Sequence, residues 1–521
     1  MHRKLALLSA VVAALAAGPA ARAVEGMGNP WETVDEAVCA GMTARDFAPE
    51  VGAPVTISVA QRVAASETLP GYCRIVASIA PRNTVEIRLP VSGWTGRLLM
   101  AGCGGLCGSV QMERTDDALA RRYAVAHTDM GHVETDLAFA DDAQALEDFV
   151  HRSTHVATRL LKAAARAYYN RAHDYAYFRG CSTGGRQGVT AALMYPEDYD
   201  GIIAGAPAAG PAIPTIAWAL QANTRTDGSS ILDAAGIETL HQNVLAACDR
   251  DDGVADGIIG DPPSCRFDPR DAVCGKAPAG RCLTPDQAAA AAKIYAGPPT
   301  PDGAPYASMG YAKGGERGWL RTLVTTDKPA GMAGVARNYL RRFAGFPDAP
   351  RTLAELDFTR HAPRLAPVDA LPDFGPDGRR LAVFRQAGGK FLFYHSWSDD
   401  SLTPATAIDV YRAHEKAFGG REQLDDFFRL FVIPGMYHCR GGEGPDAVDF
   451  LSAIEAWVER GQAPDRLIAF RPKIRPPISV EYRFPLAAQD VLFARPVFPY
   501  PATAIYTGRG DAADPANWVR R

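Results

Sequence analysis

The chain has 521 residues, of which 47% are hydrophobic and 22% are charged, and its 55 basic residues nearly balance its 59 acidic ones. This is the composition of a globular protein, long enough for one large domain with an insertion or for two domains. The formal net charge of −4 gives no reason to expect binding to nucleic acid or to an anionic membrane surface.

The N-terminal segment has the pattern of a secretion signal. A basic start with Arg3 and Lys4 precedes an apolar run, Leu5 to Ala17, and the small-residue motif Ala21-Arg22-Ala23 follows. We therefore expect a signal peptide over residues 1–23. A membrane anchor is the alternative, but the run is short for a bilayer. No later stretch is apolar enough to span a membrane, so we expect a secreted or periplasmic protein.

Ten cysteines are spread along the chain, and an even number in an exported chain favours disulfide bonds. The sequence alone does not give their pairing, although 103 and 107, 248 and 265, and 274 and 282 are close neighbours. No CxxC motif is present, so a zinc or thioredoxin-like site is a weak interpretation. The cysteines are Cys39, Cys73, Cys103, Cys107, Cys181, Cys248, Cys265, Cys274, Cys282 and Cys439.

The segment RLLMAGCGGLCGS (97–109) predicts a strand that ends in a glycine-rich loop. In α/β-hydrolases a glycine loop after an early strand supplies one N–H group of the oxyanion hole. Gly104 or Gly105 is therefore a candidate donor, provided that a nucleophile follows along the chain. A structural turn closed by Cys103 and Cys107 is the alternative, and both interpretations can hold.

The segment FRGCSTGGRQG (178–188) places Ser182 between a predicted strand and a predicted helix. Gly-x-Ser-x-Gly at 180–184 fits a nucleophile elbow, a sharp turn that exposes the serine hydroxyl at a helix N-terminus. The amide of Thr183 would then be the second oxyanion donor. A glycine-rich turn with a capping serine is the alternative. DGIIAGAP (200–207) predicts the next strand and favours an α/β fold.

A serine nucleophile needs a histidine base and an acid that orients it. GGKFLFYHSWSDDSLTP (388–404) predicts a strand followed by a loop with Asp399 and Asp400, and RLFVIPGMYHCRGG (429–442) predicts a strand followed by a loop with His438. The order Ser182, Asp399, His438 is the order of an α/β-hydrolase triad. Asp400 is the competitor for the acid. The structural alternatives are a capping carboxylate and a hydrogen-bonded loop imidazole.

Two cysteines flank the candidate nucleophile and base. Cys181 precedes Ser182, and Cys439 follows His438. If the histidine contacts the serine, the two cysteines come close enough for a disulfide that would join the two loops. A Cys181 thiol nucleophile is a poorer interpretation, because an exported thiol beside a partner should oxidise.

At these residues the sequence resembles the tannase and feruloyl esterase family, which also includes the enzyme that hydrolyses mono(2-hydroxyethyl) terephthalate. The family's mark is a Cys-Ser and a His-Cys joined by a disulfide, with an Asp between them. The resemblance covers most of the chain after the signal, and Ser396 departs from it where the family commonly has Gly. Matching segments are GCGGLCG (102–108), TDMGH (128–132), GCSTGGRQG (180–188), YPEDYDGIIAGAP (195–207) and GGKFLFYHSWSD (388–399).

The loop CDRDDGVADGIIGDPPSCRFDP (248–269) gathers hard oxygen ligands that suit Ca²⁺ better than zinc. It lacks the EF-hand spacing, and a solvated acidic loop is the alternative. The resemblance implies a structural calcium here, with Cys248 and Cys265 flanking the site. The ligands implied are the side chains of Asp249, Asp252 and Asp256 and the carbonyls of Val254 and Ile258.

About 190 residues separate the Ser182 region from the Asp399 strand, more than a hydrolase core needs. We expect an α/β-hydrolase core over 24–208 and 376–521, interrupted by a lid domain over 209–375 that carries the calcium loop and roofs the cleft. Trp319, Tyr339 and Phe343 are candidates for binding an aromatic group, although packing inside the lid is an equal explanation for each.

The resemblance implies a serine esterase that acts on aromatic or phenolic esters of feruloyl or galloyl type. Hydrolysis of terephthalate monoesters is an alternative and would need a lid cation for the free carboxylate. A non-catalytic, calcium-stabilised binding module is an alternative from another class. The sequence leaves open the acyl group, the alcohol and the oligomeric state. The cations available in the lid are Arg321, Arg337, Arg341 and Arg342.

Overall fold

The structure is a computed structural model, and it describes residues 34–133, 137–210, 212–276, 281–300, 303–326, 328–343, 358 and 378–521. The expected signal peptide lies outside these residues. Within them, no helix has the length and apolar character that a bilayer crossing requires.

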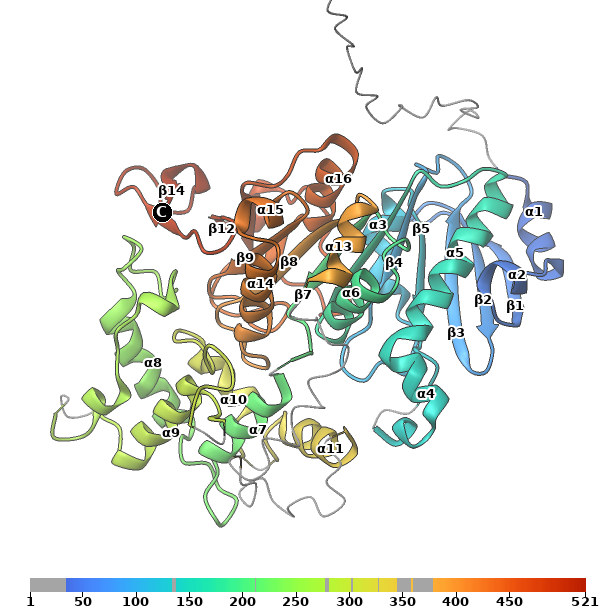
Figure 1. The fold of residues 1–521 in the computed structure, drawn as a ribbon. Coiled ribbons are helices and arrows are strands. Elements are labelled where there is room, and N and C mark those ends of the chain that lie inside the picture. Colours follow the sequence, from blue (N-terminus) through green and yellow to red (C-terminus); the bar gives the residue numbers. More distant parts are fainter. Residues whose placement is uncertain are drawn as a thin grey trace, which may run out of the picture.

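A nine-stranded mixed sheet forms the centre of the molecule, in the order β1-β2-β3-β5-β4-β6-β7-β8-β9 (Figure 1). The first three strands and β5 pair antiparallel, whereas the strands from β5 to β9 run parallel. The strands are β1 (Val55–Val63), β2 (Tyr72–Ile79), β3 (Asn83–Pro90), β4 (Arg97–Ala101), β5 (Ala124–Thr128), β6 (Tyr175–Cys181), β7 (Gly201–Gly205), β8 (Lys390–Ser396) and β9 (Phe428–Ile433).

Helices cover both faces of the sheet, which confirms the α/β class. The parallel strands are buried on both sides, and this explains why they are continuous apolar runs in the sequence. The helices of the core are α1 (Glu36–Gly41), α2 (Ala48–Val51), α3 (Asp116–Ala120), α4 (Ala143–Glu147), α5 (Ser153–Tyr169), α6 (Thr183–Met194), α13 (Arg379–Gln386), α14 (Ala405–Ala417), α15 (Arg421–Asp425) and α16 (Phe450–Arg460).

The chain between β7 and β8 contributes no strand to the large sheet in its described part. Helices α7 to α11 of this stretch gather at one end of the molecule (Figure 1) and share an apolar cluster that also takes in residues of the 130–149 segment. Trp319 and Tyr339 lie inside this cluster. The helices are α7 (Ala212–Ala222), α8 (Ala234–Cys248), α9 (Pro285–Ala296), α10 (Trp319–Thr322) and α11 (Ala333–Phe343).

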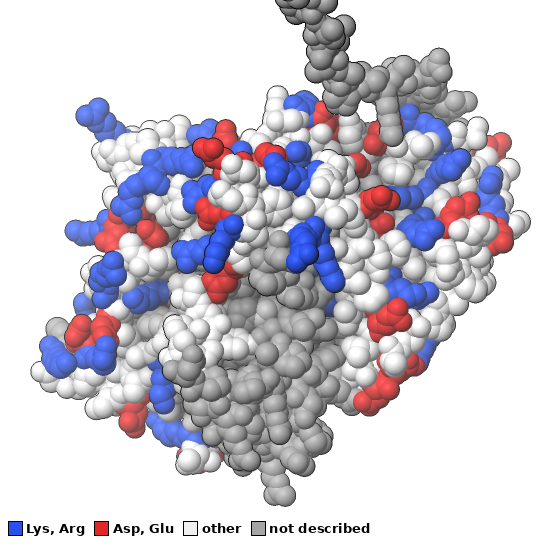
Figure 2. All heavy atoms as spheres, in the orientation of Figure 1, with Lys and Arg blue, Asp and Glu red and all other residues white. Residues whose placement is uncertain are grey.

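Two small antiparallel sheets follow β9, and the sequence analysis did not anticipate them. Their order is β10-β11-β12 and β13-β14. The strands are β10 (Ala447–Val448), β11 (Leu467–Pro472), β12 (Val491–Val497), β13 (Ala504–Tyr506) and β14 (Trp518–Arg520). On the face shown in Figure 2, basic and acidic side chains are interspersed over the described surface, as the near balance of charges leads one to expect.

Candidate active site

Ser182 lies at a sharp turn between β6 and α6. Its backbone has φ 62° and ψ −122°, a combination that a residue with a side chain rarely adopts and that is typical of a nucleophile elbow. The turn is held by hydrogen bonds from the Ser182 amide to the Gly205 carbonyl and from the Ala208 amide to the Ser182 carbonyl, each 3.0 Å long.

Two glycines let the backbone of this turn pack closely. A Cβ atom on Gly185 would lie 2.0 Å from the Gly205 carbonyl oxygen, and one on Gly180 would lie 2.6 Å from the backbone of Gly184. Any side chain at these positions would push α6 away from the end of the sheet. The glycines of the motif therefore have a steric reason that is separate from the chemistry of Ser182.

His438 and Asp399 lie on the loops that follow β9 and β8. His438 Nδ1 is 2.9 Å from Asp399 Oδ2. The other carboxylate oxygen of Asp399 accepts hydrogen bonds from the amides of Ser401 and Leu402, at 2.9 and 2.7 Å. The carboxylate therefore has a fixed position and presents one oxygen to the imidazole.

The charges of this pair shift both pKa values. Burial alone would raise the pKa of Asp399, but the His438 imidazole and the Leu402 amide lower it below its ordinary value. Burial alone would lower the pKa of His438, but the Asp399 carboxylate raises it. The acid therefore stays ionised, and the imidazolium form of His438 is stabilised, as general-base chemistry requires.

Asp400 has a different partner from Asp399. Arg321 of α10 donates to both of its carboxylate oxygens, with a closest contact of 2.6 Å. Asp400 meets His438 only through the histidine's backbone amide, at 3.3 Å. The structure therefore brings Asp399, and not Asp400, to the imidazole, and it ties Arg321 to a carboxylate of the protein.

A second histidine, His395, lies near Asp399 but has its own partners. Its Nδ1 accepts a hydrogen bond from the Ser396 amide at 2.9 Å, and its Nε2 lies 3.1 Å from the Thr406 hydroxyl. Burial lowers its pKa. The Ser396 hydroxyl donates to the Tyr437 carbonyl at 3.0 Å, so the residue that departs from the family pattern joins the acid loop to the base loop.

A disulfide links the serine turn to the histidine loop. Cys181 and Cys439 are bonded across 258 residues of sequence, which fixes the residues beside Ser182 and His438 to each other. The other pairs are Cys39–Cys73, Cys103–Cys107, Cys248–Cys265 and Cys274–Cys282. No described cysteine is free, so the structure leaves no thiol for the Cys181 alternative.

The glycine loop after β4 lies against the start of α6. The Thr183 hydroxyl donates to the Gly105 carbonyl, and the Cys103 amide donates to Gln187 Oε1 at 3.0 Å. The Cys103 amide is therefore occupied. Among the described residues, neither the Gly104 amide nor the Gly105 amide donates a hydrogen bond. These two amides, with that of Thr183 in the first turn of α6, remain the candidates for the oxyanion hole.

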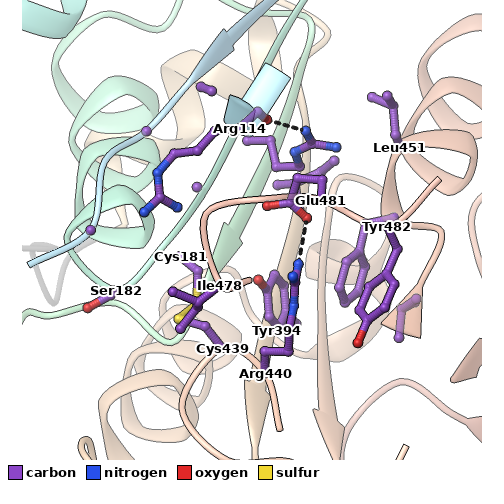
Figure 3. Close-up of a pocket in the computed structure, with 18 of the residues that line it drawn as sticks. Arg114, Cys181, Ser182, Tyr394, Cys439, Arg440, Leu451, Ile478, Glu481 and Tyr482 are labelled. Carbon is purple, nitrogen blue, oxygen red and sulfur yellow. Dashed lines mark hydrogen bonds and ion pairs between the residues drawn. A yellow bond between two sulfur atoms is a disulfide. The ribbon is translucent and has the colours of Figure 1, made fainter. Parts of the chain in front are cut away.

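Ser182, His438, Gly104 and Gly105 all line one cavity of about 270 Å³ (Figure 3). Among the described residues, the Ser182 hydroxyl has no hydrogen-bond partner, so it stays open to this space. The far wall comes from residues after β9, including Ile478, Glu481 and Tyr482. The structure thus brings the predicted serine and base and the two candidate glycines to one concave site.

Of the residues proposed for binding substrate in the inserted segment, the described ones, which are Trp319, Arg321, Arg337 and Tyr339, do not line this cavity. Trp319 and Tyr339 are 1% and 6% exposed, which favours the packing explanation for both. Arg337 is exposed on α11. The side chains of Arg341, Arg342 and Phe343 lie outside the described part of the structure.

The acidic loop after α8 is closed by Cys248–Cys265. Burial, followed by the charges of Asp256 and Asp249, raises the pKa of Asp252 to about 7, and burial followed by Asp256 raises that of Asp249. Neighbouring carboxylates thus add to the effect of burial in both shifts. Asp256 also contacts Arg495, at 2.7 Å. Among the described residues no group of three or more His, Cys, Asp or Glu side chains could hold a metal ion.

Sequence reasoning missed the wall that residues between 478 and 484 build and the cation beside the glycine loop, Arg114. Arg114 lies in a short 3₁₀ helix, Met112–Thr115, between β4 and β5, and it lines the cavity. No motif marks either feature, because side chains far apart in sequence meet here only through the fold.

The fold and this arrangement of side chains define an α/β-hydrolase. A model of the tannase and feruloyl esterase family matches residues 67–338 and 365–520, and the chain belongs to this family. It is 31% identical to mono(2-hydroxyethyl) terephthalate hydrolase of Piscinibacter sakaiensis, over 88% of this chain and 86% of the relative. It is 30% identical to feruloyl esterase B of Aspergillus niger, over 86% of each chain.

A solved structure of an esterase from Aspergillus oryzae superposes with a TM-score of 0.80 at 26% identity and covers 93% of this chain and all of that one. The family and these relatives make the chain a carboxylic ester hydrolase of the feruloyl esterase and tannase type. The relatives include both a terephthalate monoester hydrolase and a feruloyl esterase, so they do not single out one acyl group.

Proposed function

We propose that the protein is a secreted serine esterase that cleaves aromatic or phenolic carboxylic esters through Ser182, His438 and Asp399. The observation that carries the proposal is the contact of 2.9 Å between His438 Nδ1 and Asp399 Oδ2, because His438 also lines the cavity that the strained Ser182 lines. A capping serine and an unrelated loop histidine would have no reason to meet there.

The chemistry follows from the geometry. His438 takes the proton of the Ser182 hydroxyl while the oxygen attacks the ester carbonyl, and Asp399 stabilises the imidazolium that forms. The amides of Thr183 and of Gly104 or Gly105 donate to the oxyanion. The proton then passes from His438 to the leaving alcohol. Water, deprotonated by His438, attacks the acyl group and releases the carboxylic acid and free Ser182.

The inserted segment and the acidic loop have supporting roles in this proposal. Helices α7 to α11 act as a lid that excludes water and receives part of the substrate. Ca²⁺ bound at Asp249, Asp252 and Asp256 with the carbonyls of Val254 and Ile258 would hold the loop without taking part in the reaction. The five disulfides favour an oxidising location, which supports secretion.

The test is hydrolysis of methyl ferulate, methyl gallate and mono(2-hydroxyethyl) terephthalate by the wild type and by Ser182→Ala. We expect one of these esters to be cleaved and the variant to lose turnover by at least about 10⁴-fold. Labelling of the wild type by a fluorophosphonate checks the nucleophile independently. A folded Ser182→Ala protein with full turnover would contradict the proposal, and a wild type that resists labelling would favour the non-catalytic binding module.

A further inference from the structure

The cavity beside Ser182 extends away from the inserted segment, between the strand ends and the chain after β9. Four of its lining residues are aromatic. Tyr394 and Phe450 stack with their ring centroids 4.2 Å apart, and Tyr482 and Phe484 stand beside them. Such walls suit a planar ring, because stacking and edge contacts add to the burial of its surface. One part of a substrate ester therefore fits here.

Each described acidic side chain that lines the cavity pairs with an arginine. Glu481 contacts Arg440 at 3.4 Å. The other three acidic side chains are also paired with arginines. The closest contacts are Asp117 to Arg179 at 2.6 Å, Asp446 to Arg475 at 2.8 Å and Asp449 to Arg121 at 3.7 Å. The cavity therefore offers no unpaired carboxylate to a cationic substrate.

Arg114 is the cavity's cation without a carboxylate partner among the described residues. Its Nε donates to the Gln111 side chain at 2.7 Å, and its backbone carbonyl accepts from Arg179, but the two Nη groups have no partner in the described part of the chain. Burial lowers its pKa, as it does for a cation held away from water.

The guanidinium is aimed at the reacting end of the cavity. A Cβ atom on Gly104 would lie 3.2 Å from an Nη atom of Arg114, so the cation lies directly beside the glycine loop proposed as the oxyanion hole. Figure 3 shows the side chain extending from its helix toward the side on which Cys181 and Ser182 lie. The N–H groups of its two Nη atoms, held in the fixed plane of the guanidinium, match the two oxygens of a carboxylate.

We infer that Arg114 forms an anion subsite in the core of the enzyme and that the preferred esters carry a free carboxylate on the part that enters this cavity. The inference rests on the proposed esterase function and deepens it. It places the carboxylate-binding cation in the chain between β4 and β5. Arg321 of the inserted segment, in contrast, forms an ion pair with Asp400. Arg114 is thereby a specificity-determining residue.

The carboxylate can belong to the acid part or to the alcohol part of the ester, and two matched substrate pairs distinguish these sources. The first pair is monomethyl terephthalate and methyl 4-carbamoylbenzoate. The second pair is 2-(benzoyloxy)acetate and 2-(benzoyloxy)acetamide. In each pair the amide keeps the shape and removes the charge. The anion preference is the ratio of kcat/KM for the charged ester to that for its amide.

Arg114→Gln should lower the anion preference roughly 10- to 100-fold in one pair, since a charge-assisted pair is worth about 1.5–3 kcal/mol. The loss should fall mainly on KM, because the subsite binds substrate and transition state alike. Arg114→Lys should restore part of it. Glu481→Gln should raise the anion preference, because it removes the carboxylate that pairs with Arg440. Arg62→Gln on β1, at the far edge of the sheet, removes the same charge and should leave the ratio unchanged.

Two failures are distinguishable. If neutral esters are cleaved in a Ser182-dependent manner and Arg114→Gln leaves the anion preference of both pairs intact, the subsite is wrong and the esterase function stands. An equal loss on charged and neutral esters also overturns the subsite and makes Arg114 part of the general machinery. If no ester is cleaved by the wild type, the proposed function fails first.

Discussion

Asp399 and His438 meet side chain to side chain at 2.9 Å, whereas Asp400, the next residue, is bonded to Arg321 and reaches only the backbone of His438. Two adjacent carboxylates on one loop thus have separate tasks. Asp399 can orient an imidazole, and Asp400 ties the base loop to helix α10 of the inserted segment.

Replacing each carboxylate by its amide should separate these tasks. Asp399→Asn should lower kcat by about 10⁴-fold with the fold retained, because the imidazole loses the charge that stabilises its protonated form. Asp400→Asn is the matched control. It should lower the melting temperature while leaving kcat much less affected than Asp399→Asn does. Steady-state kinetics and thermal unfolding on both variants are the measurements. Equal losses of turnover would show that the acid role is shared.

The acid limb of the pH profile should lie above the pH expected for an ordinary histidine. His438 acts as a base only when it is neutral, and its pKa is raised by Asp399 against the effect of burial. As pH falls through this raised pKa, kcat/KM should fall, so the limb should be centred above about pH 6.5. In Asp399→Asn the limb should move to lower pH. The same limb in both proteins would show that another group controls it.

Removing the disulfide between Cys181 and Cys439 should affect activity as well as stability. The double variant Cys181→Ala/Cys439→Ala removes both cysteines, so neither is left unpaired. It should lose about 2–5 kcal/mol of unfolding free energy. It should also lose turnover, because the bond fixes the neighbours of Ser182 and His438. Cys39→Ala/Cys73→Ala is the control, since that pair joins α1 to β2 far from the site in the sheet order. If both variants lose stability but keep kcat, the bond between the loops is structural only.

The parts of the site that follow short apolar strands could be predicted from the sequence. Ser182, Asp399 and His438 each stand just beyond a parallel strand, and the ends of parallel strands meet at one edge of the sheet. The buried runs of β6, β8 and β9 therefore located these residues. The two glycines that the elbow needs for close packing were visible as part of the same motif.

The cavity wall and its charges could not be predicted in the same way. Arg114 meets Gly104, and Glu481 meets Arg440, through contacts that no local pattern encodes. The small sheets after β9 were missed because β10, β13 and β14 are too short for a clear alternation. Trp319 was considered for an aromatic site, yet it is core, because the sequence does not tell an exposed aromatic ring from a buried one.

Calcium should stabilise the protein through the loop between Cys248 and Cys265. The expected ligands include Asp252, whose raised pKa reflects burial and then neighbouring carboxylates, and a cation would relieve that repulsion. At a free concentration of about 100 times Kd, Ca²⁺ should add roughly 2.7 kcal/mol of unfolding free energy. Elemental analysis and thermal melting with and without a chelator measure this.

Variants of this loop show whether the effect comes from the proposed ligands. Asp252→Asn should abolish the response to the chelator. Asp251→Asn, an exposed neighbour in the same loop, should keep it, because Asp251 is outside the proposed ligand set. Turnover at low temperature should be the same with and without Ca²⁺, since the loop lies apart from Ser182. If the protein contains no metal and the chelator does not change its melting temperature, the calcium site is wrong. Asp256 would then be paired with Arg495 only, and the loop would be a solvated acidic turn.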